Sequence, residues 1–267
     1  MIYLQQILSE NSERGRLDCA ALDIARLHYP DLDPQPTLDQ LNQLASSLGD
    51  RIRNFNDGRE FVEKAQQFLF EELGFRGNAE NFYDPLNSCL NQVLERRVGI
   101  PITLSVMYME IARRLHMPVY GIGLPGHFLL QFDDGRFSTY IDPFNRGVPL
   151  TARDCYTLAN APVPDPALLR RVTKKQIAMR MLQNLHRVYV DQRDFERAFT
   201  VLDLLLSAAP ENAAWYRARG ALHIERKRYQ AAKKDFEKYL DMEPDALDRP
   251  DIEKQLGAIR SWLAVVN

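Results

Sequence analysis

The sequence contains no long apolar run and no excess of basic residues. No apolar stretch approaches the roughly 18 residues that a membrane-spanning helix needs, so no such helix is expected. The first residues, MIYLQQILSENSERG, lack a charged segment followed by a long apolar core, so we expect no signal peptide. The net charge is −2, whereas a nucleic-acid-binding protein typically carries a basic excess. The sequence therefore predicts a cytoplasmic protein whose partner is neither a membrane nor a nucleic acid.

Cysteine is also scarce. The chain has three cysteines, Cys19, Cys89 and Cys155, an odd number without paired spacing. Such cysteines are typical of reduced thiols in the cytoplasm. No Cys-x-x-Cys pair occurs, and no two of the five histidines stand at metal-ligand spacing. We therefore expect neither a structural metal nor a cofactor.

The 267 residues are enough for one large domain or two modest ones. Charge divides unevenly, because residues 1–172 carry 17 basic and 22 acidic residues (net −5) while residues 173–267 carry 17 and 14 (net +3). Between these halves the run APVPDPALL contains three prolines, which is typical of a linker. We predict one domain over residues 1–163 and a second over residues 164–267.

Apolar residues recur at helical spacing through much of residues 1–80. A further helix is predicted to begin at Pro101, because proline fits the first helical turn. Its sequence is apolar through most of its length, which indicates a buried central helix. Residues 119–122 are rich in β-formers, and two more β-rich runs flank Asp134-Gly135. The predicted fold class is therefore α+β, mainly helical, with a small antiparallel sheet.

The Asp134-Gly135 pair predicts a tight hairpin. If these two residues form a type I′ turn, the numbers of opposed residues sum to 269, and His127 faces Asp142. Opposed side chains on neighbouring strands have Cβ atoms roughly 5 Å apart, so the carboxylate could orient the imidazole and raise its basicity. Such a pair makes two members of a catalytic triad. The alternative is that the pair only holds two strands in register or takes part in ligand binding.

The C-terminal part contains a 34-residue repeat, marked by Pro210 and Pro244. A small residue, then an apolar residue, then proline at this period is the tetratricopeptide signature. Residues 250–265 are predicted to form a final capping helix. First helices of such repeats line a groove that binds peptides, and three arginines there predict an acidic segment or a C-terminal carboxylate as the ligand. The alternative is that some of these residues pack against the first domain. The predicted groove residues are Arg180, Gln183, Arg187, Arg217 and Ile224.

Three motifs, RRVGIPITLSVMY, GLPGHF and YIDPFNRG, resemble the transglutaminase-like fold, a relative of papain-type enzymes. The fuller pattern is similar to a bacterial family (the Sir B type) that joins such a domain to C-terminal tetratricopeptide repeats, and the resemblance covers residues 35–265. It implies a Cys that opens the central helix, a His that starts a strand and an Asp that ends the next strand. His127 and Asp142 match the latter two, but Pro101 stands where the family has its nucleophilic Cys.

Two functions remain open. The first is a non-catalytic protein-binding adaptor or regulator, built on a degenerate transglutaminase-like domain and the repeats. The second is an acyl transferase or amide hydrolase in which Cys89, or the hydroxyl of Thr103 or Ser105, attacks while His127 acts as base and Asp142 orients it. A free cysteine such as Cys89 is otherwise typical of a small buried apolar residue.

Overall fold

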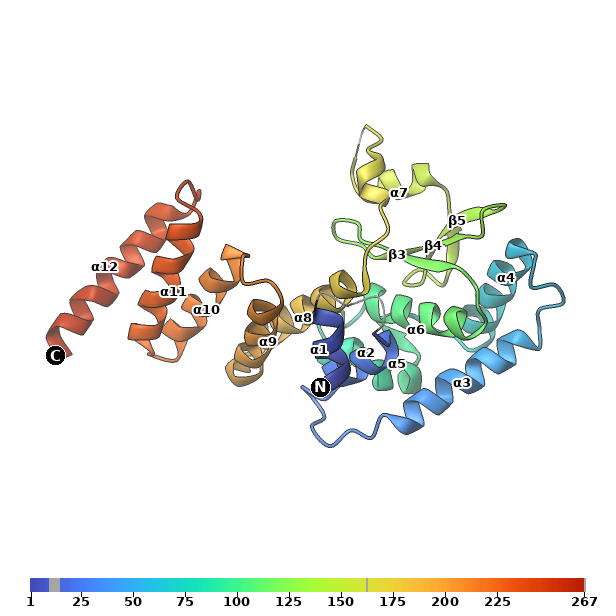
Figure 1. Ribbon diagram of the computed structural model, residues 1–267, viewed down its shortest axis with the longest axis horizontal. Helices are drawn as coiled ribbons and strands as arrows, with labels where there is room; N and C mark the ends of the chain where they lie inside the picture. The colour runs from blue at the N-terminus through green and yellow to red at the C-terminus, as the bar shows by residue number, and fades with distance from the viewer. Residues whose placement is uncertain (10–14, 162, 267) are drawn as a thin grey trace. The chain divides into compact units, whose positions relative to one another are not determined.

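The computed structural model describes residues 1–9, 15–161 and 163–266, and Figure 1 shows the order of its elements. The chain forms two compact units, Met1–Asn184 and Leu185–Asn267. Helices predominate, and the principal sheet has four antiparallel strands. The predicted fold class, mainly helical α+β with a small antiparallel sheet, is confirmed.

The first unit contains the sheet and the earlier helices. Its helices are α1 (Ile2–Leu8), α2 (Leu17–Ala25), α3 (Gln35–Gly49), α4 (Gly58–Ala65), α5 (Leu90–Arg96), α6 (Pro101–Arg114), α7 (Ala152–Leu158) and the first part of α8 (Lys174–Asp191). A π-helical segment (Gln66–Glu72) and two 3₁₀ turns (Pro85–Ser88 and Pro166–Leu169) complete the helical structure described in this unit. The strands are β1 (Arg76–Gly77), β2 (Val98–Gly99), β3 (Val119–Ile122), β4 (Leu129–Asp133), β5 (Ser138–Asp142) and β6 (Val148–Leu150).

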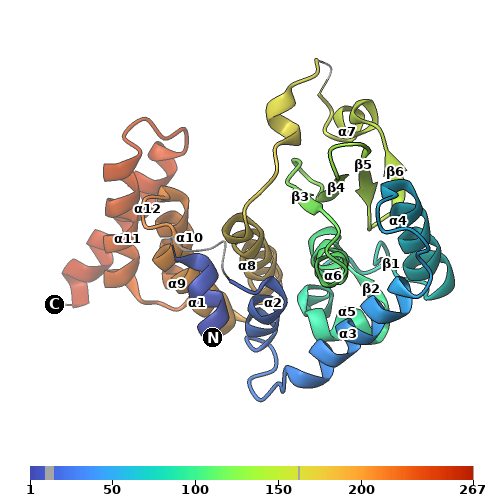
Figure 2. The same ribbon diagram turned by 45° about the vertical axis from the view of Figure 1, so that its right-hand side comes forward.

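Helix α6 lies at the centre of this unit, as its apolar sequence predicts. Nearly every side chain from Ile102 to Ala112 is buried. One side of the helix packs against α2, α3 and α5, and the other lies against β3 and β4. Figures 1 and 2 show α6 between these helices and the sheet. Burial on all sides explains why its apolar residues are not confined to one stripe.

The strands β3, β4, β5 and β6 form a meander in that order, but the predicted hairpin register is wrong. Phe132 pairs with Thr139 and Gln131 with Tyr140, so the numbers of opposed residues sum to 271. The amide of Asp134 donates to the carbonyl of Phe137 (3.3 Å), which makes Gly135 and Arg136 the central turn residues.

The turn chemistry explains this shift of two residues. The Asp134 carboxylate accepts hydrogen bonds from the amides of Arg136 and Phe137, both at 2.8 Å. Gly135 has a φ of +83°, while Arg136 is not among the residues with positive φ. A single positive φ at the first central position is typical of a type II′ turn rather than type I′. Asp134 therefore closes the turn instead of occupying its centre.

The two units meet between Asn184 and Leu185, inside α8, later than the predicted boundary at residues 163–164. The reason is that the chain entering α8 is tied to the first unit. The amide of Val172 donates a hydrogen bond to the carbonyl of Gly121 on β3 (2.9 Å), and the backbone of Arg171 pairs with that of Ile122 in an isolated antiparallel β-bridge. Pro162, in the predicted linker, lies outside the described residues.

The second unit consists of helical pairs with a final helix. Its elements are the end of α8, α9 (Phe195–Ala208), α10 (Ala213–Glu225), α11 (Tyr229–Met242) and α12 (Arg249–Val266). Gly220 on α10 is the small residue of its repeat, and a Cβ there would come within 2.7 Å of the Phe236 ring on α11. The predicted final helix over residues 250–265 corresponds to α12, which packs on α11. Among the described residues, no helix is long and apolar enough to cross a membrane.

Candidate functional site

The position of the family's nucleophile lies at the N-terminus of α6. Pro101 is the first residue of this helix and is half-buried. The segment before it, β2, pairs in parallel with β1, and the amide of Asn78 donates to the carbonyl of Gly99 (3.0 Å). Proline supplies neither a nucleophilic atom nor an amide N–H at this helix end.

Asp142 ends β5 beside this helix terminus. The amide of Gly77 in β1 donates to the carbonyl of Phe144 (2.9 Å), and so joins the β1–β2 pair to the turn that follows Asp142. The residue Asp142 is 4% exposed. One oxygen accepts from the amides of Phe144 (3.0 Å) and Asn145 (3.2 Å), and the other accepts from the Asn145 side-chain amide (2.7 Å). This carboxylate is therefore committed to its own turn.

His127 lies two residues before β4, at the end of a tight turn. Its amide donates to the carbonyl of Leu124 (3.2 Å), and Gly126 within the turn has a φ of +73°. Proline followed by a glycine of positive φ is typical of a type II turn. In the described part of the chain, the His127 side chain makes no hydrogen bond and no ion pair with Asp142. The register explains why, because Asp142 is opposite Val148 on one side and aligns with Leu129, not His127, on the other.

Arg180 holds the His127 turn from α8. Its guanidinium donates to the carbonyls of Leu124 (3.0 Å) and His127 (2.6 Å) and lies over the Phe128 ring, 5.5 Å from its centroid. Burial lowers the pKa of this guanidinium from its ordinary value. The sequence predicts that Arg180 lines the repeat groove, but its guanidinium instead donates hydrogen bonds to backbone carbonyls of the first unit.

The proposed substitute nucleophiles are all buried. Cys89 is fully buried at the N-terminus of α5, and its thiol donates to the carbonyl of Pro85 (3.6 Å). Thr103 and Ser105 are likewise fully buried on α6, and neither hydroxyl has a hydrogen-bond partner among the described residues. A hydroxyl without a neighbouring base remains a weak nucleophile.

The other two thiols are poor nucleophiles. Burial raises the pKa of Cys19 to about 11 and that of Cys155 to about 11. Since the thiolate is the reactive form, both are almost entirely protonated at neutral pH. Across residues 1–9, 15–161 and 163–266, no cluster of three or more His, Cys, Asp or Glu side chains could hold a metal ion.

The predicted groove residues divide between the two units. Arg180 and Gln183 belong to the first unit, and Arg187, Arg217 and Ile224 to the second. Arg187 is exposed on α8, and Arg217 forms an ion pair with Asp248. The guanidiniums of Arg180 and Arg217, which contributed to the acidic-ligand prediction, are thus engaged by oxygen atoms of the chain itself.

Only Ile224 of the predicted set lines a hollow of about 500 Å³ in the second unit. Sequence reasoning missed Tyr229 and Trp262, whose rings lie 4.4 Å apart between centroids. Trp262 is 45% exposed, and its position as a tryptophan within the predicted final helix is the sequence signal that could have revealed it. The hollow is lined by Ala221, Ile224, Glu225, Tyr229, Gln255, Ala258, Ile259 and Trp262.

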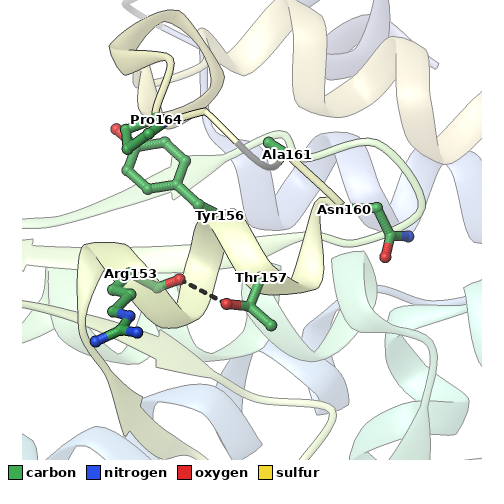
Figure 3. Close-up of a pocket in the computed structure, with 6 residues that line it drawn as sticks. All are labelled: Arg153, Tyr156, Thr157, Asn160, Ala161 and Pro164. Carbon is green, nitrogen blue, oxygen red and sulfur yellow. Dashed lines mark hydrogen bonds between the residues drawn. The ribbon is translucent and has the colours of Figure 1, made fainter.

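A second hollow, of about 780 Å³, lies on α7 in the first unit. Figure 3 shows its six lining residues, with the ring of Tyr156 directed toward Pro164. The hydroxyl of Thr157 donates back to the carbonyl of Arg153 on the same helix (3.0 Å), so it is not directed at a ligand. Arg153 supplies the hollow's single charged side chain among the described residues. No set of converging polar groups marks it as a reaction site.

Comparison with known proteins agrees with this architecture. Residues 35–183 match the transglutaminase-like superfamily, and residues 185–257 match a tetratricopeptide repeat family. A UPF0162 protein of Xylella fastidiosa is 35% identical over 234 residues, covering 84% of this chain and 83% of the relative. The UPF0162 protein PA3419 of Pseudomonas aeruginosa is 29% identical over 247 residues, covering 90% and 89%.

A shorter sequence match is to a larger protein. F-box only protein 21 of mouse is 36% identical over 155 residues, which make up 54% of this chain but only 24% of the mouse protein. No solved structure matches the chain. The transglutaminase-like match over more than half of the chain, followed by the repeats and the identity to the Xylella relative, shows that this chain belongs to the transglutaminase-like superfamily, in the UPF0162 family of proteins.

Proposed function

We propose that this protein is a non-catalytic cytosolic adaptor or regulator that binds partner proteins. The observation that carries the proposal is that the Asp142 carboxylate is occupied by hydrogen bonds within its own turn. Acid–base catalysis by a triad needs a carboxylate free to orient the imidazole and a nucleophile within its reach. Here the Asp142 carboxylate accepts three hydrogen bonds from its own turn, and proline stands at the nucleophile position.

The repeat unit supports the binding role. Tetratricopeptide repeats generally mediate protein–protein interactions through the face formed by their first helices. The hollow on α10, α11 and α12 presents the rings of Tyr229 and Trp262 beside the aliphatic side chain of Ile224. An apolar hollow with partly exposed aromatic rings is suited to an apolar side chain of a partner.

A labelling experiment with the full-length protein tests the catalytic alternative. Wild-type protein and His127→Ala are treated with an iodoacetamide probe for thiols and a fluorophosphonate probe for hydroxyls, and labelled sites are mapped by mass spectrometry. We expect no label at Cys89, Thr103 or Ser105 that depends on His127. Labelling of any of them that disappears in His127→Ala would overturn the proposal, because it would demonstrate an activated nucleophile.

A matched pair of variants on α12 tests the binding role. Trp262→Glu places a charge in the apolar hollow, while Ala264→Glu places the same charge about 200° around the helix, on an exposed position. Proteins captured by immobilised wild-type protein from a lysate of a UPF0162-containing bacterium are quantified by mass spectrometry and compared with both variants. We expect specific partners to be lost with Trp262→Glu and retained with Ala264→Glu. Equal capture by both would remove the hollow as the binding surface.

A further inference from the structure

A hollow of about 460 Å³ lies in the first unit, at the opposite end of α6 from Pro101. Its walls come from the last turns of α6, the link to β3, the start of α8 and the first residue of α2. We call it the α6-end hollow. Its volume is in the range of small-molecule sites, and it shares no lining residue with the hollow beside Trp262.

The walls of the α6-end hollow are mostly apolar. The apolar lining consists of Leu17, Met109, Met117, Val119, Val172 and Ile177. Three of these side chains are buried in the core and the other three are half-buried, so packing fixes the shape of the wall. A preformed apolar wall of this kind is suited to an apolar group of a small ligand.

Glu110 brings a negative charge to one wall of the hollow. It lines the hollow although it is only 2% exposed. Its Oε2 atom accepts hydrogen bonds from the guanidiniums of Arg113 (2.8 Å) and Arg114 (2.9 Å). Its Oε1 atom accepts none from the described residues, yet it is not among the unpartnered polar atoms that the protein fully encloses. Oε1 is therefore free to accept a hydrogen bond from a ligand in the hollow.

Arg113 brings a positive charge to the same wall. Its Nε and Nη2 atoms both lie 2.8 Å from Oε2 of Glu110, while Nη1 donates no hydrogen bond in the parts of the chain that the structure describes. The side chain is 48% exposed, so the guanidinium is accessible to a ligand. The other basic side chains of the hollow are the exposed His116 and Lys174, whose ammonium group donates to the carbonyl of Gly15 (2.9 Å).

A second buried carboxylate holds this ion pair in place. Asp18 is fully buried, accepts a hydrogen bond from Arg114 (2.7 Å) and lies 3.5 Å from Nη2 of Arg113. Burial, together with the charge of Asp18, raises the pKa of Glu110 from its ordinary value. A cation beside Oε1 would offset both effects, whereas an anion there would add to them. The two carboxylates face three guanidiniums, those of Arg16, Arg113 and Arg114, so one positive charge is left in excess for a ligand carboxylate.

We propose that the α6-end hollow binds a free α-amino acid with an apolar side chain. Its ammonium group lies on Oε1 of Glu110, its carboxylate on Nη1 of Arg113, and its side chain against the apolar wall. An α-amino acid carries its two charges on one carbon atom, so they are as close together as the opposite charges that Glu110 and Arg113 present. A ligand with one charge would leave one of these two groups unmatched. This inference goes beyond the adaptor function, because it adds a small-molecule site to the first unit.

Calorimetric titration of the full-length protein with each apolar L-amino acid tests the ligand class. For the amino acid that binds most tightly, analogues without the amine, without the carboxylate and with an amidated carboxylate are then compared. For leucine these are isocaproate, isoamylamine and leucinamide. We expect the amino acid to bind and each analogue to bind about tenfold or more weakly, because a charged hydrogen bond is lost each time.

Each other result of the titration would overturn the inference. If no apolar amino acid binds, the hollow is not an amino-acid site. If the analogue without the amine binds equally well, the hollow recognises an anion and Glu110 has no part in binding. If the amidated analogue binds equally well, the occupant is the N-terminus of a peptide rather than a free amino acid.

Two variants locate the binding site. Glu110→Gln removes the charge beside the ammonium group, and Arg113→Met removes the partner of the carboxylate; each should weaken binding about tenfold or more. As a matched control, Arg51→Met removes a guanidinium with 38% side-chain exposure from its ion pair with Glu72 in the same unit, and it should bind like wild type. If Glu110→Gln fails to fold, Arg113→Met and the analogue series decide the question. Unchanged affinity in Arg113→Met would refute the inference.

The inference and the adaptor function can fail separately. Amino-acid binding that is lost in Trp262→Glu and retained in Arg113→Met would place the ligand in the second unit and refute the inference. The adaptor function depends on Asp142 and on the hollow beside Trp262, so it would stand if no amino acid bound. Labelling of a nucleophile that depends on His127 would refute the non-catalytic function and leave the α6-end hollow as it is.

Discussion

Replacing Arg180 should loosen the turn that carries His127. The guanidinium donates to two carbonyls of that turn at 3.0 and 2.6 Å. Hydrogen bonds from a charged donor contribute about 1.5–3 kcal/mol each, which would give roughly 3–6 kcal/mol for two. Burial lowers the pKa of Arg180, so the desolvated charge offsets part of this sum. We therefore expect Arg180→Met to lower the free energy of unfolding of the first unit by about 2 kcal/mol.

Arg180→Lys is the informative comparison. A lysine keeps the charge and most of the length, but its compact ammonium group lacks the planar fork that reaches two carbonyls at once. We expect it to recover about half of the loss. Urea denaturation measures the free energy, and hydrogen exchange at the His127 amide, which donates to Leu124, reports on the turn itself. If Arg180→Met leaves both measurements at wild-type values, the guanidinium does not hold the turn.

Three further predictions concern stability. Burial alone would raise the pKa of Asp18, but hydrogen bonds from neighbouring arginines hold this pKa well below 3.8, so the stability that the Asp18 carboxylate contributes is present above about pH 4 and is lost as the pH falls. Asp18→Asn should lower the free energy of unfolding by about 3 kcal/mol at pH 7. In a series of urea denaturations at different pH, the variant's midpoint should fall less on acidification than that of wild type. Burial lowers the pKa of His186 below 6.5, so the folded state with a neutral His186 has its full stability above that pH and loses stability on acidification. His186→Leu should therefore reduce the fall in the second unit's melting temperature between about pH 7 and 5. Gly147 has a φ of +66° and a Cβ there would lie 2.3 Å from the Phe70 ring, whereas Gly135, with a φ of +83°, has open space around it. In thermal denaturation, Gly147→Ala should lower the stability by about 2–4 kcal/mol and Gly135→Ala by only about 1 kcal/mol. Equal losses of stability in the two variants would contradict the packing argument.

Much of the fold follows from local sequence signals. The central helix from Pro101 and the β-rich run at residues 119–122 are where periodicity and composition predicted them, because burial imposes a repeating pattern on the chain. The 34-residue repeat likewise has a direct physical cause, since Gly220 must be small for Phe236 to pack against α10. These features depend on neighbours that are close in sequence or on one dominant packing contact.

The candidate site depended on details that local patterns do not carry. The hairpin register depends on which backbone amides donate hydrogen bonds to the Asp134 side chain. The sequence does not show this choice, because a glycine in the turn is compatible with both type I′ and type II′. That choice separated His127 from Asp142. Arg180 has the helical position of a groove residue, but its carbonyl partners lie more than 50 residues away in the chain. Contacts of this kind come from tertiary packing alone.

The turn after Asp142 also limits what a restored nucleophile could do at this site. Pro101→Cys would return a thiol to the start of α6, where a helix N-terminus favours the thiolate. It would not return a catalyst, because the carboxylate that should orient the imidazole would still accept its three hydrogen bonds from Phe144 and Asn145. The Pro101→Cys thiol should therefore react with iodoacetamide at the same rate with and without His127. Under the proposed non-catalytic function, restoring the sulfur is a single substitution, but the turn that occupies the Asp142 carboxylate would also have to be rebuilt before this carboxylate could orient an imidazole.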